Sequence, residues 1–232
     1  MSTALPDWQL KSVDGVEYYE YTPHPRLLIA FLTRKGGTSK AEYESLNLSY
    51  NVGDDARNVE ENYSRARQAL RLAGLVTVKQ VHKDTVLPIT NDKTPAELLE
   101  GDACFTDQLN LGLGLKVADC LPVYFYSNDL RCVGIAHCGW RGTLARIAEK
   151  TAHQMSRRFS VPLPDLRFSL GPCICPNCYP VGEDVRKHSS PHSRPRASSS
   201  PGARGQRRFA RQRRILGDRC SAFAVRRSHF PP

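Results

Sequence analysis

Short apolar runs separated by polar turns make up most of the chain up to residue 170. The run at residues 27–32 is long enough for a buried strand, and a Gly-Gly turn follows it. Comparable runs recur at residues 75–81, 85–89, 111–117, 123–126, 132–136 and 165–170. Their lengths, and the turn residues between them, predict a mixed β-sheet of several short strands.

Two segments carry apolar residues at helical spacing instead. Asp55 can cap a helix over residues 56–73, which Gly74 ends. A second amphipathic helix begins at about Thr143, which is a plausible N-cap. Its apolar face consists of Leu144, Ile147, Ala148, Thr151 and Met155. Two helices among many short strands predict an α/β (mixed α+β) fold, in which flanking helices cover a sandwich with a mixed β-sheet.

The segment AHCGWRG, at residues 136–142, joins an apolar run to the start of the second helix. Backbone N–H groups at a helix start lack intrahelical partners and the helix dipole is positive there, so phosphate binds such corners well. Arg141 can add a bidentate fork. The alternative is a tight turn with a buried Trp140 and a solvated Arg141, and the corner alone favours this alternative.

Three residues that can bind a metal ion each end an apolar run: His82, Cys120 and His137. A catalytic zinc typically has three protein ligands of this kind and keeps a fourth position open. Ligands at strand ends can converge although they are far apart in sequence. The alternative is a small buried thiol and two ordinary histidines. Spacing alone favours that alternative, because no CxxC or HExxH pattern defines the geometry.

Five motifs, in order along the chain, resemble the bacterial YfiH family. They are TRKGGTS at residues 33–39, SLNL at 45–48, QVH at 80–82, ADCLP at 118–122 and AHCGWRG at 136–142. The resemblance extends from about Leu27 to Lys187. The family was long labelled multicopper polyphenol oxidase or laccase-like, and it is now described as purine nucleoside phosphorylases that also deaminate adenosine. The resemblance therefore implies a YfiH-like fold and these two activities.

The resemblance also implies roles for particular residues. In the family the matching His, Cys and His bind zinc, so the expected metal and catalytic residues are His82, Cys120 and His137. Zn²⁺ is the expected cofactor, with Cu²⁺ as the alternative ion. The weaker candidates for holding phosphate and ribose are Arg34, Asn47 and Arg141. The expected small-molecule partners are phosphate and the purine nucleosides adenosine, inosine and methylthioadenosine.

Adenosine deamination adds a demand that the motifs leave open. Zinc deaminases use an acid/base carboxylate that is not itself a ligand. Asp119 is the nearest carboxylate in sequence to Cys120, but neighbours on a strand point to opposite faces. The sequence therefore does not assign this role.

Three other functions compete with this assignment. Cys120, activated by His137 or His82, would be the nucleophile of a cysteine-dependent hydrolase, and some family members are linked to peptidoglycan editing. A metal-dependent binding module is the non-enzymatic alternative. A copper polyphenol oxidase, the older label, needs many histidines with paired HxH spacing. The chain has seven histidines and no such pair, so we reject four-copper chemistry.

The formal net charge of +10 first suggests a nucleic-acid-binding protein, but the charge is not spread over the chain. From Lys187 onward there are twelve Lys or Arg and one acidic residue, Asp218, a net of +11. The preceding 186 residues therefore carry a net charge of only −1. Nucleic acid is an unexpected partner, except for nonspecific attraction to the basic C-terminal segment.

That C-terminal segment differs from the rest in composition. Ser, Pro, Arg, Ala and Gly dominate it, as is typical of disorder, so the predicted organisation is a catalytic domain at 1–187 and a basic tail at 188–232. The family continues with structured chain at this point. Because Arg outnumbers Lys eleven to one from Lys187, we hypothesise a shifted reading frame. A domain without its closing strands would expose a sheet edge and be poorly soluble.

The remaining sequence features concern compartment and thiols. No apolar segment approaches the length of a membrane span and no basic start precedes one, so the expectation is a cytoplasmic protein without membrane partners. The eight cysteines are then expected to be thiols and ligands. Three of them, Cys173, Cys175 and Cys178, form a C-x-C-x2-C cluster whose role is open, and an accidental cluster is the favoured interpretation.

Overall fold

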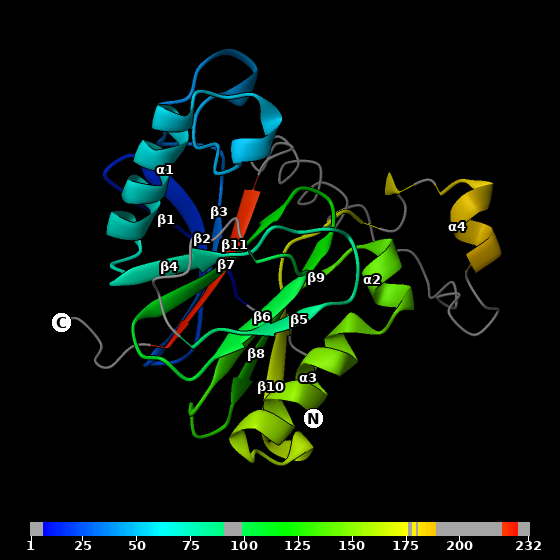
Figure 1. Ribbon diagram of the computed structural model, residues 1–232. Coiled ribbons are helices and arrows are strands. Elements are labelled where there is room, and N and C mark those ends of the chain that lie inside the picture. Colours follow the sequence, from blue (N-terminus) through cyan, green and yellow to red (C-terminus); the bar gives the residue numbers. More distant parts are fainter. Residues whose placement is uncertain (1–6, 91–98, 176–177, 180, 189–219, 227–232) are drawn as a thin grey trace.

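A computed structural model describes residues 7–90, 99–175, 178–179, 181–188 and 220–226 of the chain. Its named strands form two mixed sheets that pack face to face, and helices lie on the outer sides of the two sheets (Figure 1). One apolar cluster lies between the sheets, and two others join each sheet to its own long helix. The predicted mixed α+β sandwich is therefore confirmed, with four layers in the order helix, sheet, sheet, helix.

The first sheet is antiparallel except at one edge, where β4 pairs in parallel with β7. Its strands, in spatial order, are β1 (Gln9–Val13), β2 (Val16–His24), β3 (Leu27–Leu32), β11 (Cys220–Arg226), β7 (Leu111–Val117) and β4 (Gly74–Thr77). The second sheet repeats this arrangement, with β5 parallel to β6 at its edge. Its spatial order is β10 (Leu166–Leu170), β8 (Leu121–Ser127), β9 (Val133–Cys138), β6 (Ala103–Thr106) and β5 (Val86–Pro88).

Strand β3 shows why the layers assemble as they do. Its six residues are all buried, since successive side chains point to opposite faces and both faces are covered. Leu27, Ile29 and Phe31 join the cluster between the sheets. The alternate residues, Leu28, Ala30 and Leu32, pack in the cluster that includes the long helix of the first sheet. A continuous apolar run thus became a strand buried on both sides.

The helices correct the predicted boundaries. They are α1 (Ala56–Ala69), α2 (Trp140–Leu144), α3 (Ile147–Phe159) and α4 (Glu183–His188), with short 3₁₀ turns at η1 (Ala41–Tyr43), η2 (Tyr50–Val52) and η4 (Leu163–Asp165). Asp55 caps α1 as predicted, because its side chain accepts a hydrogen bond from the Arg57 amide. Gly74 does not end α1 but begins β4, a strand that the sheet extends by pairing.

The second predicted helix is broken in two. Arg146 has left-handed backbone angles and separates α2 from α3, so Thr143 lies inside α2 and is not the cap. On the predicted face, Ile147, Thr151 and Met155 are buried, whereas Leu144, which precedes the break, is exposed. The break therefore turns Leu144 away from the core that the other residues share.

Strand β11 corrects the prediction of a domain that ends at residue 187. Residues 220–226 lie in the middle of the first sheet, antiparallel to both β3 and β7 (Figure 1). Ala222 and Ala224 are buried in the cluster between the sheets. The prediction failed here because a short run of small apolar residues inside a polar, basic segment gains its stability from two partner strands, which composition does not reveal. Apart from His188, the last residue of α4, the rest of the predicted tail lies outside the described residues.

Candidate functional site

The candidate site lies at one end of three neighbouring strands of the second sheet. In the register of β8 and β9, Leu121 is opposite Cys138, which places Cys120 opposite Gly139. In the register of β6 and β9, Ala103 is opposite Ala136, which places Asp102 opposite His137. Side chains of opposed residues share a face of the sheet. Cys120, His137 and Asp102 therefore meet on one face at the same sheet end.

His137 is 3% exposed and is held by Asp102 at two points. Its backbone amide donates to the Asp102 carbonyl oxygen at 2.7 Å, and its ring Nδ1 lies 2.9 Å from the Asp102 carboxylate oxygen Oδ1. Burial alone would lower the pKa of His137, but hydrogen bonds with Asp102 and Cys120 raise it to about 9. Burial likewise opposes the charge on Asp102, yet the bond from His137 and those from backbone amides bring its pKa below the usual value.

Gly139 leaves the space in which the Cys120 thiol and the His137 ring approach each other. A Cβ built at Gly139 would lie 3.3 Å from the Cys120 Sγ and 3.5 Å from the His137 Nε2. Both donor atoms therefore point into the volume that a side chain would fill. Since Nδ1 of the ring faces Asp102, Nε2 is the nitrogen available to a bound ion or substrate.

His82 reaches the same place from the turn between β4 and β5. Its ring is perpendicular to that of His137, with 5.0 Å between the ring centroids. A cavity of about 20 Å³, room for roughly one water molecule or ion, lies among these groups. Its lining consists of His82, Lys83, Cys120, His137, Gly139, Trp140, Arg141 and Gly142. The structure thus brings the three sequence-predicted ligands to one cavity.

The three side chains do not form a closed ligand shell as they stand. Among the described residues, no three His, Cys, Asp or Glu side chains are grouped closely enough to hold a metal ion. Cys120 and His137 converge, whereas His82 is exposed at the rim. The metal assignment therefore stays a prediction.

The glycine-rich corner after β9 is a part of the cavity wall. Helix α2 starts directly after Gly139, so Trp140 and Arg141 occupy its first turn. The Arg141 guanidinium lies over the Trp140 ring, 4.2 Å from its centroid. Trp140 is only partly buried, unlike in the alternative of a tight turn with a buried Trp140, whereas Arg141 is exposed, as that alternative expects. Arg141 is available for an anion at the cavity.

The other two predicted phosphate and ribose residues have structural roles elsewhere. Asn47 is 2% exposed, and its side-chain amide bonds Ser49 and Asp54. The Arg34 Nε donates to the Glu44 carbonyl oxygen at 2.6 Å. Neither residue lines the cavity. The structure therefore does not bring these two residues to the cavity, and their assignment to substrate stays a prediction.

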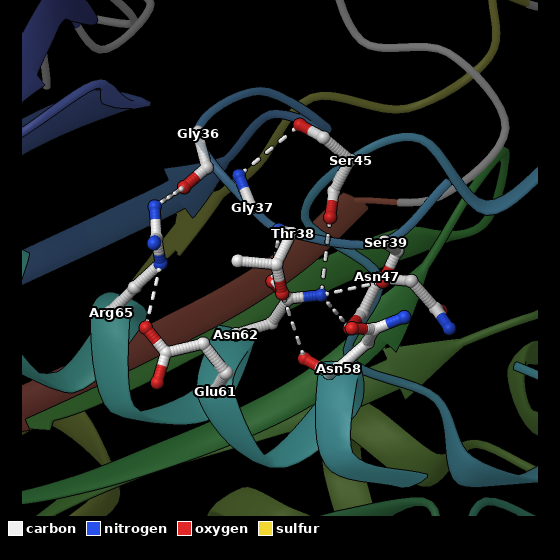
Figure 2. Close-up of polar contacts among 10 residues, drawn as sticks. All are labelled: Gly36, Gly37, Thr38, Ser39, Ser45, Asn47, Asn58, Glu61, Asn62 and Arg65. Atoms are coloured by element: carbon white, nitrogen blue, oxygen red, sulfur yellow. Dashed lines mark hydrogen bonds and ion pairs between the residues drawn. The ribbon is translucent and has the colours of Figure 1, made fainter. Parts of the chain in front are cut away.

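Asn62 of α1 holds the two motifs together (Figure 2). Its Oδ1 accepts from the Thr38 amide at 2.8 Å, and its Nδ2 donates to the Ser39 hydroxyl and to the carbonyl oxygens of Ser45 and Asn47. Gly37 permits the close approach, since a Cβ there would lie 2.0 Å from the Ser45 carbonyl oxygen. The motifs that first indicated the family are thus, in this region, a structural scaffold.

Replacing Asn62 with leucine should lower the free energy of unfolding by about 3 kcal/mol, because several buried polar groups lose their partner. Asn62 is 0% exposed, so water cannot take its place without rearrangement. Urea unfolding followed by circular dichroism measures the effect. Gln68→Leu, at an exposed position of the same helix, is the matched control and should change stability by less than roughly 0.5 kcal/mol. Equal midpoints for the two variants would contradict the role of Asn62.

Sequence reasoning missed Asp102 and Lys83. Asp102 precedes the apolar run of β6, and an acidic residue directly before a buried strand was the available signal, although no motif includes it. Lys83 belongs to none of the motifs, but it lines the cavity. Asp119, considered for the acid/base role, is exposed, and its carbonyl oxygen accepts from the Ile174 amide.

The three clustered cysteines lie close to the site. The Ile174 bond to Asp119 brings this loop alongside Cys120. Burial raises the pKa of the Cys173 thiol, and the nearby Cys120 and Cys175 add to the effect. The Cys175 and Cys178 sulfur atoms are 2.8 Å apart. Among the described residues, these cysteines do not form a three-membered metal-binding group.

A family model described as "multi-copper polyphenol oxidoreductase laccase" matches residues 28–230, which includes β11. The chain is 36% identical over 156 residues to the purine nucleoside phosphorylase YfiH of Escherichia coli, and the alignment covers 67% of this chain and 62% of that protein. The protein belongs to the YfiH family. Its match through residue 230 shows that the family likeness continues beyond Lys187.

Other YfiH relatives carry related names. The chain is 34% identical to the purine nucleoside phosphorylase PA4543 of Pseudomonas aeruginosa, over 88% of this chain and 81% of that protein. It is 32% identical to the adenosine deaminase RL5 of an unknown prokaryotic organism, over 75% of this chain and 66% of that protein. The crystal structure of YlmD from Geobacillus stearothermophilus superposes with a TM-score of 0.78 at 26% identity, covering 96% of this chain and all of that one.

These comparisons support an enzyme function in this family, because the relatives are named as purine nucleoside phosphorylases or as an adenosine deaminase. They also confirm the YfiH-like fold. In the part of the chain that the structure describes, no helix is both long and apolar enough to cross a membrane.

Proposed function

We propose that this YfiH-family chain is a zinc-dependent purine nucleoside phosphorylase with adenosine deaminase activity, and that His82, Cys120 and His137 hold the zinc. The observation that carries the proposal is the meeting of these three residues at one cavity beside Arg141. The names of the relatives support it, since they include purine nucleoside phosphorylases and an adenosine deaminase.

The donor set suits zinc. One thiol and two imidazoles are a known catalytic ligand combination, and the cavity has room for one ion. His82 is exposed, so its ring can change rotamer rapidly to complete the set. When bound, zinc supplies a Lewis acid that can polarise a substrate or activate water.

The residues around the donors suit an anionic co-substrate. Arg141 and Lys83 place two cationic side chains in the wall of the cavity. Phosphate carries its negative charge on oxygen atoms that a guanidinium and an ammonium both bind. We propose that Arg141, together with Lys83, holds phosphate while the nucleoside lies outside the cavity, with its ribose toward them.

A specific observation favours a second function, a cysteine-dependent hydrolase. His137 has hydrogen bonds to both Cys120 and Asp102, which is the arrangement of a nucleophile, a base and an orienting carboxylate. A thiolate at Cys120 could then attack an ester or amide directly. Removal of metal separates the two proposals, because chelation should stop a zinc enzyme and leave a cysteine nucleophile active.

Copper oxidase chemistry of the multicopper kind is not part of this proposal, despite the description of the family. Of the histidines that the structure describes, His82 and His137 line the cavity, and the His188 ring lies 6.2 Å from that of Trp140 between centroids. His153 lies near Glu149 on α3, and His24 is on β2. A cluster of several copper ions needs many more histidine ligands in one place.

The test is to incubate metal-analysed protein with adenosine, with and without phosphate, and to identify the products. Phosphorolysis should yield adenine and ribose 1-phosphate only when phosphate is present. Deamination should yield inosine in both cases, and with phosphate part of that inosine should be converted to hypoxanthine and ribose 1-phosphate. Chelation should remove both activities and zinc should restore them. Metal-replete protein that forms neither adenine nor inosine would contradict the proposal.

A further inference from the structure

We infer that Asp102 is the positioning residue of this site, and that its buried carboxylate holds both histidines in place. The inference deepens the proposed function, because it concerns the residues proposed to bind zinc. Its geometric part, the backbone position of His82 and the orientation of the His137 ring, does not depend on which ion or substrate the site binds.

The carboxylate accepts hydrogen bonds from two separate parts of the chain. Three consecutive backbone amides of the turn, those of Val81, His82 and Lys83, donate to it at 3.1, 3.0 and 2.9 Å. The His137 ring nitrogen Nδ1 lies 2.9 Å from it. Successive backbone amides that converge on one anion form a concave anion-binding turn. Here the anion is a side chain of the protein, and the turn carries His82.

These hydrogen bonds stabilise an unusual backbone conformation in the turn. His82 has a positive φ of 58°, an uncommon conformation for a residue with a side chain. Asp102 is fully buried, so the bonds form away from water, and they replace the hydration that the carboxylate loses. The strained turn and the buried charge therefore stabilise each other, and the position of His82 depends on Asp102.

The same carboxylate determines which nitrogen of His137 faces the cavity. With Nδ1 bonded to Asp102, the ring directs Nε2 toward Cys120 and the space over Gly139. A carboxylate behind a metal-binding histidine commonly orients the ring and makes it a better ligand. One residue thus sets the position of the turn and the orientation of the ring.

The bonds also explain why this residue has to be a carboxylate. The oxygen Oδ1 faces the His82 amide and the His137 ring, and Oδ2 faces the amides of Val81 and Lys83. An asparagine side chain has only one oxygen. In either orientation of the amide, its NH₂ group replaces a carboxylate oxygen that accepts from two donors, and those two donors lose their acceptor. Asp102→Asn should therefore disturb either the His82 and His137 pair or the backbone of the turn.

The experiment compares wild-type protein, Asp102→Asn and Asp54→Asn. Asp54 is the matched control, because its carboxylate also holds a loop, by bonds from Ser39, Asn47 and the Asp55 amide, and does not line the cavity. We expect zinc affinity, measured by competition with a chromophoric chelator, to fall roughly 10- to 100-fold in Asp102→Asn. It should stay within about twofold of the wild type in Asp54→Asn, since additivity holds for distant sites.

A second measurement uses nitrogen NMR of the histidine rings in wild-type protein without added metal. A protonated, exchange-protected Nδ1 on His137 is the expected result, and an unprotonated Nδ1 would overturn the inference even if Asp102→Asn does not fold. Unchanged zinc affinity in folded Asp102→Asn would also overturn it. If wild-type protein binds no zinc but shows the protected Nδ1, the proposed function fails and the positioning role of Asp102 is supported.

Discussion

Replacing Cys120 with alanine should remove bound zinc and abolish adenosine phosphorolysis together. Its Sγ and the His137 Nε2 both face the space over Gly139, so the variant loses one of the two donors that already converge. Loss of a supporting residue outside the ligands typically costs 10- to 100-fold in affinity, and loss of a ligand should cost more than roughly 100-fold. Zinc analysis after gel filtration and product assays with adenosine and phosphate measure both effects.

The control for this prediction is Cys132→Ala. Cys132 is a buried cysteine just before β9, at the opposite end of the strand from His137. It should reduce stability slightly and leave zinc content and turnover unchanged. Phosphorolysis at the wild-type rate in Cys120→Ala would exclude Cys120 from the chemistry, whereas loss of activity that chelation does not reproduce would favour the cysteine nucleophile.

Replacing Ala224 with aspartate should prevent stable folding or lower the melting temperature by roughly 10 °C or more. Ala224 is 1% exposed, lies opposite Ile29 of β3 and Leu113 of β7, and packs between the two sheets. A carboxylate there has no partner, and an uncompensated buried charge costs about 3–5 kcal/mol. Thermal unfolding followed by circular dichroism, with the soluble fraction after expression, measures the effect.

Ala56→Asp provides the same change of side chain at an exposed position. Ala56 is the first residue of α1, where an acidic side chain also interacts favourably with the helix dipole, so this variant should melt at or slightly above the wild-type temperature. Equal melting of the two variants would mean that β11 is not part of the folded core. The domain would then end near residue 187, as the sequence had predicted.

Seven of the strands and the long helices were largely predictable because their signals are local, whereas β1, β2, β6 and the division into two sheets were not predicted. Apolar runs such as residues 27–32 and 111–117 are strands in the structure, and Asp55 caps α1 as expected. The errors occurred where tertiary contacts outweigh local preference. Gly74 could end a helix, but it begins strand β4, which pairs with β7. Residues 220–226 are flanked in sequence by basic and polar residues, but they form a central strand of the first sheet.

The candidate site divides in the same way. His82, Cys120 and His137 were recognisable as chemically able residues at the ends of apolar runs, and the structure brings them to one cavity. Arg34 and Asn47 belong to equally distinctive motifs, yet their side chains hold loops together. A motif shows which residues occur together, and it does not show whether they face a ligand or one another.

The sequence by itself determined the mixed α+β class, the family and the residue types able to bind a metal, because alternation, capping and motifs are properties of neighbouring residues. Only the tertiary structure decided that Asp102 faces His137 and that β11 lies between β3 and β7. Both depend on strand register and pairing, which join residues far apart in the chain. Long-range pairings of this kind are chosen by the packing of the whole core, and no local pattern encodes them.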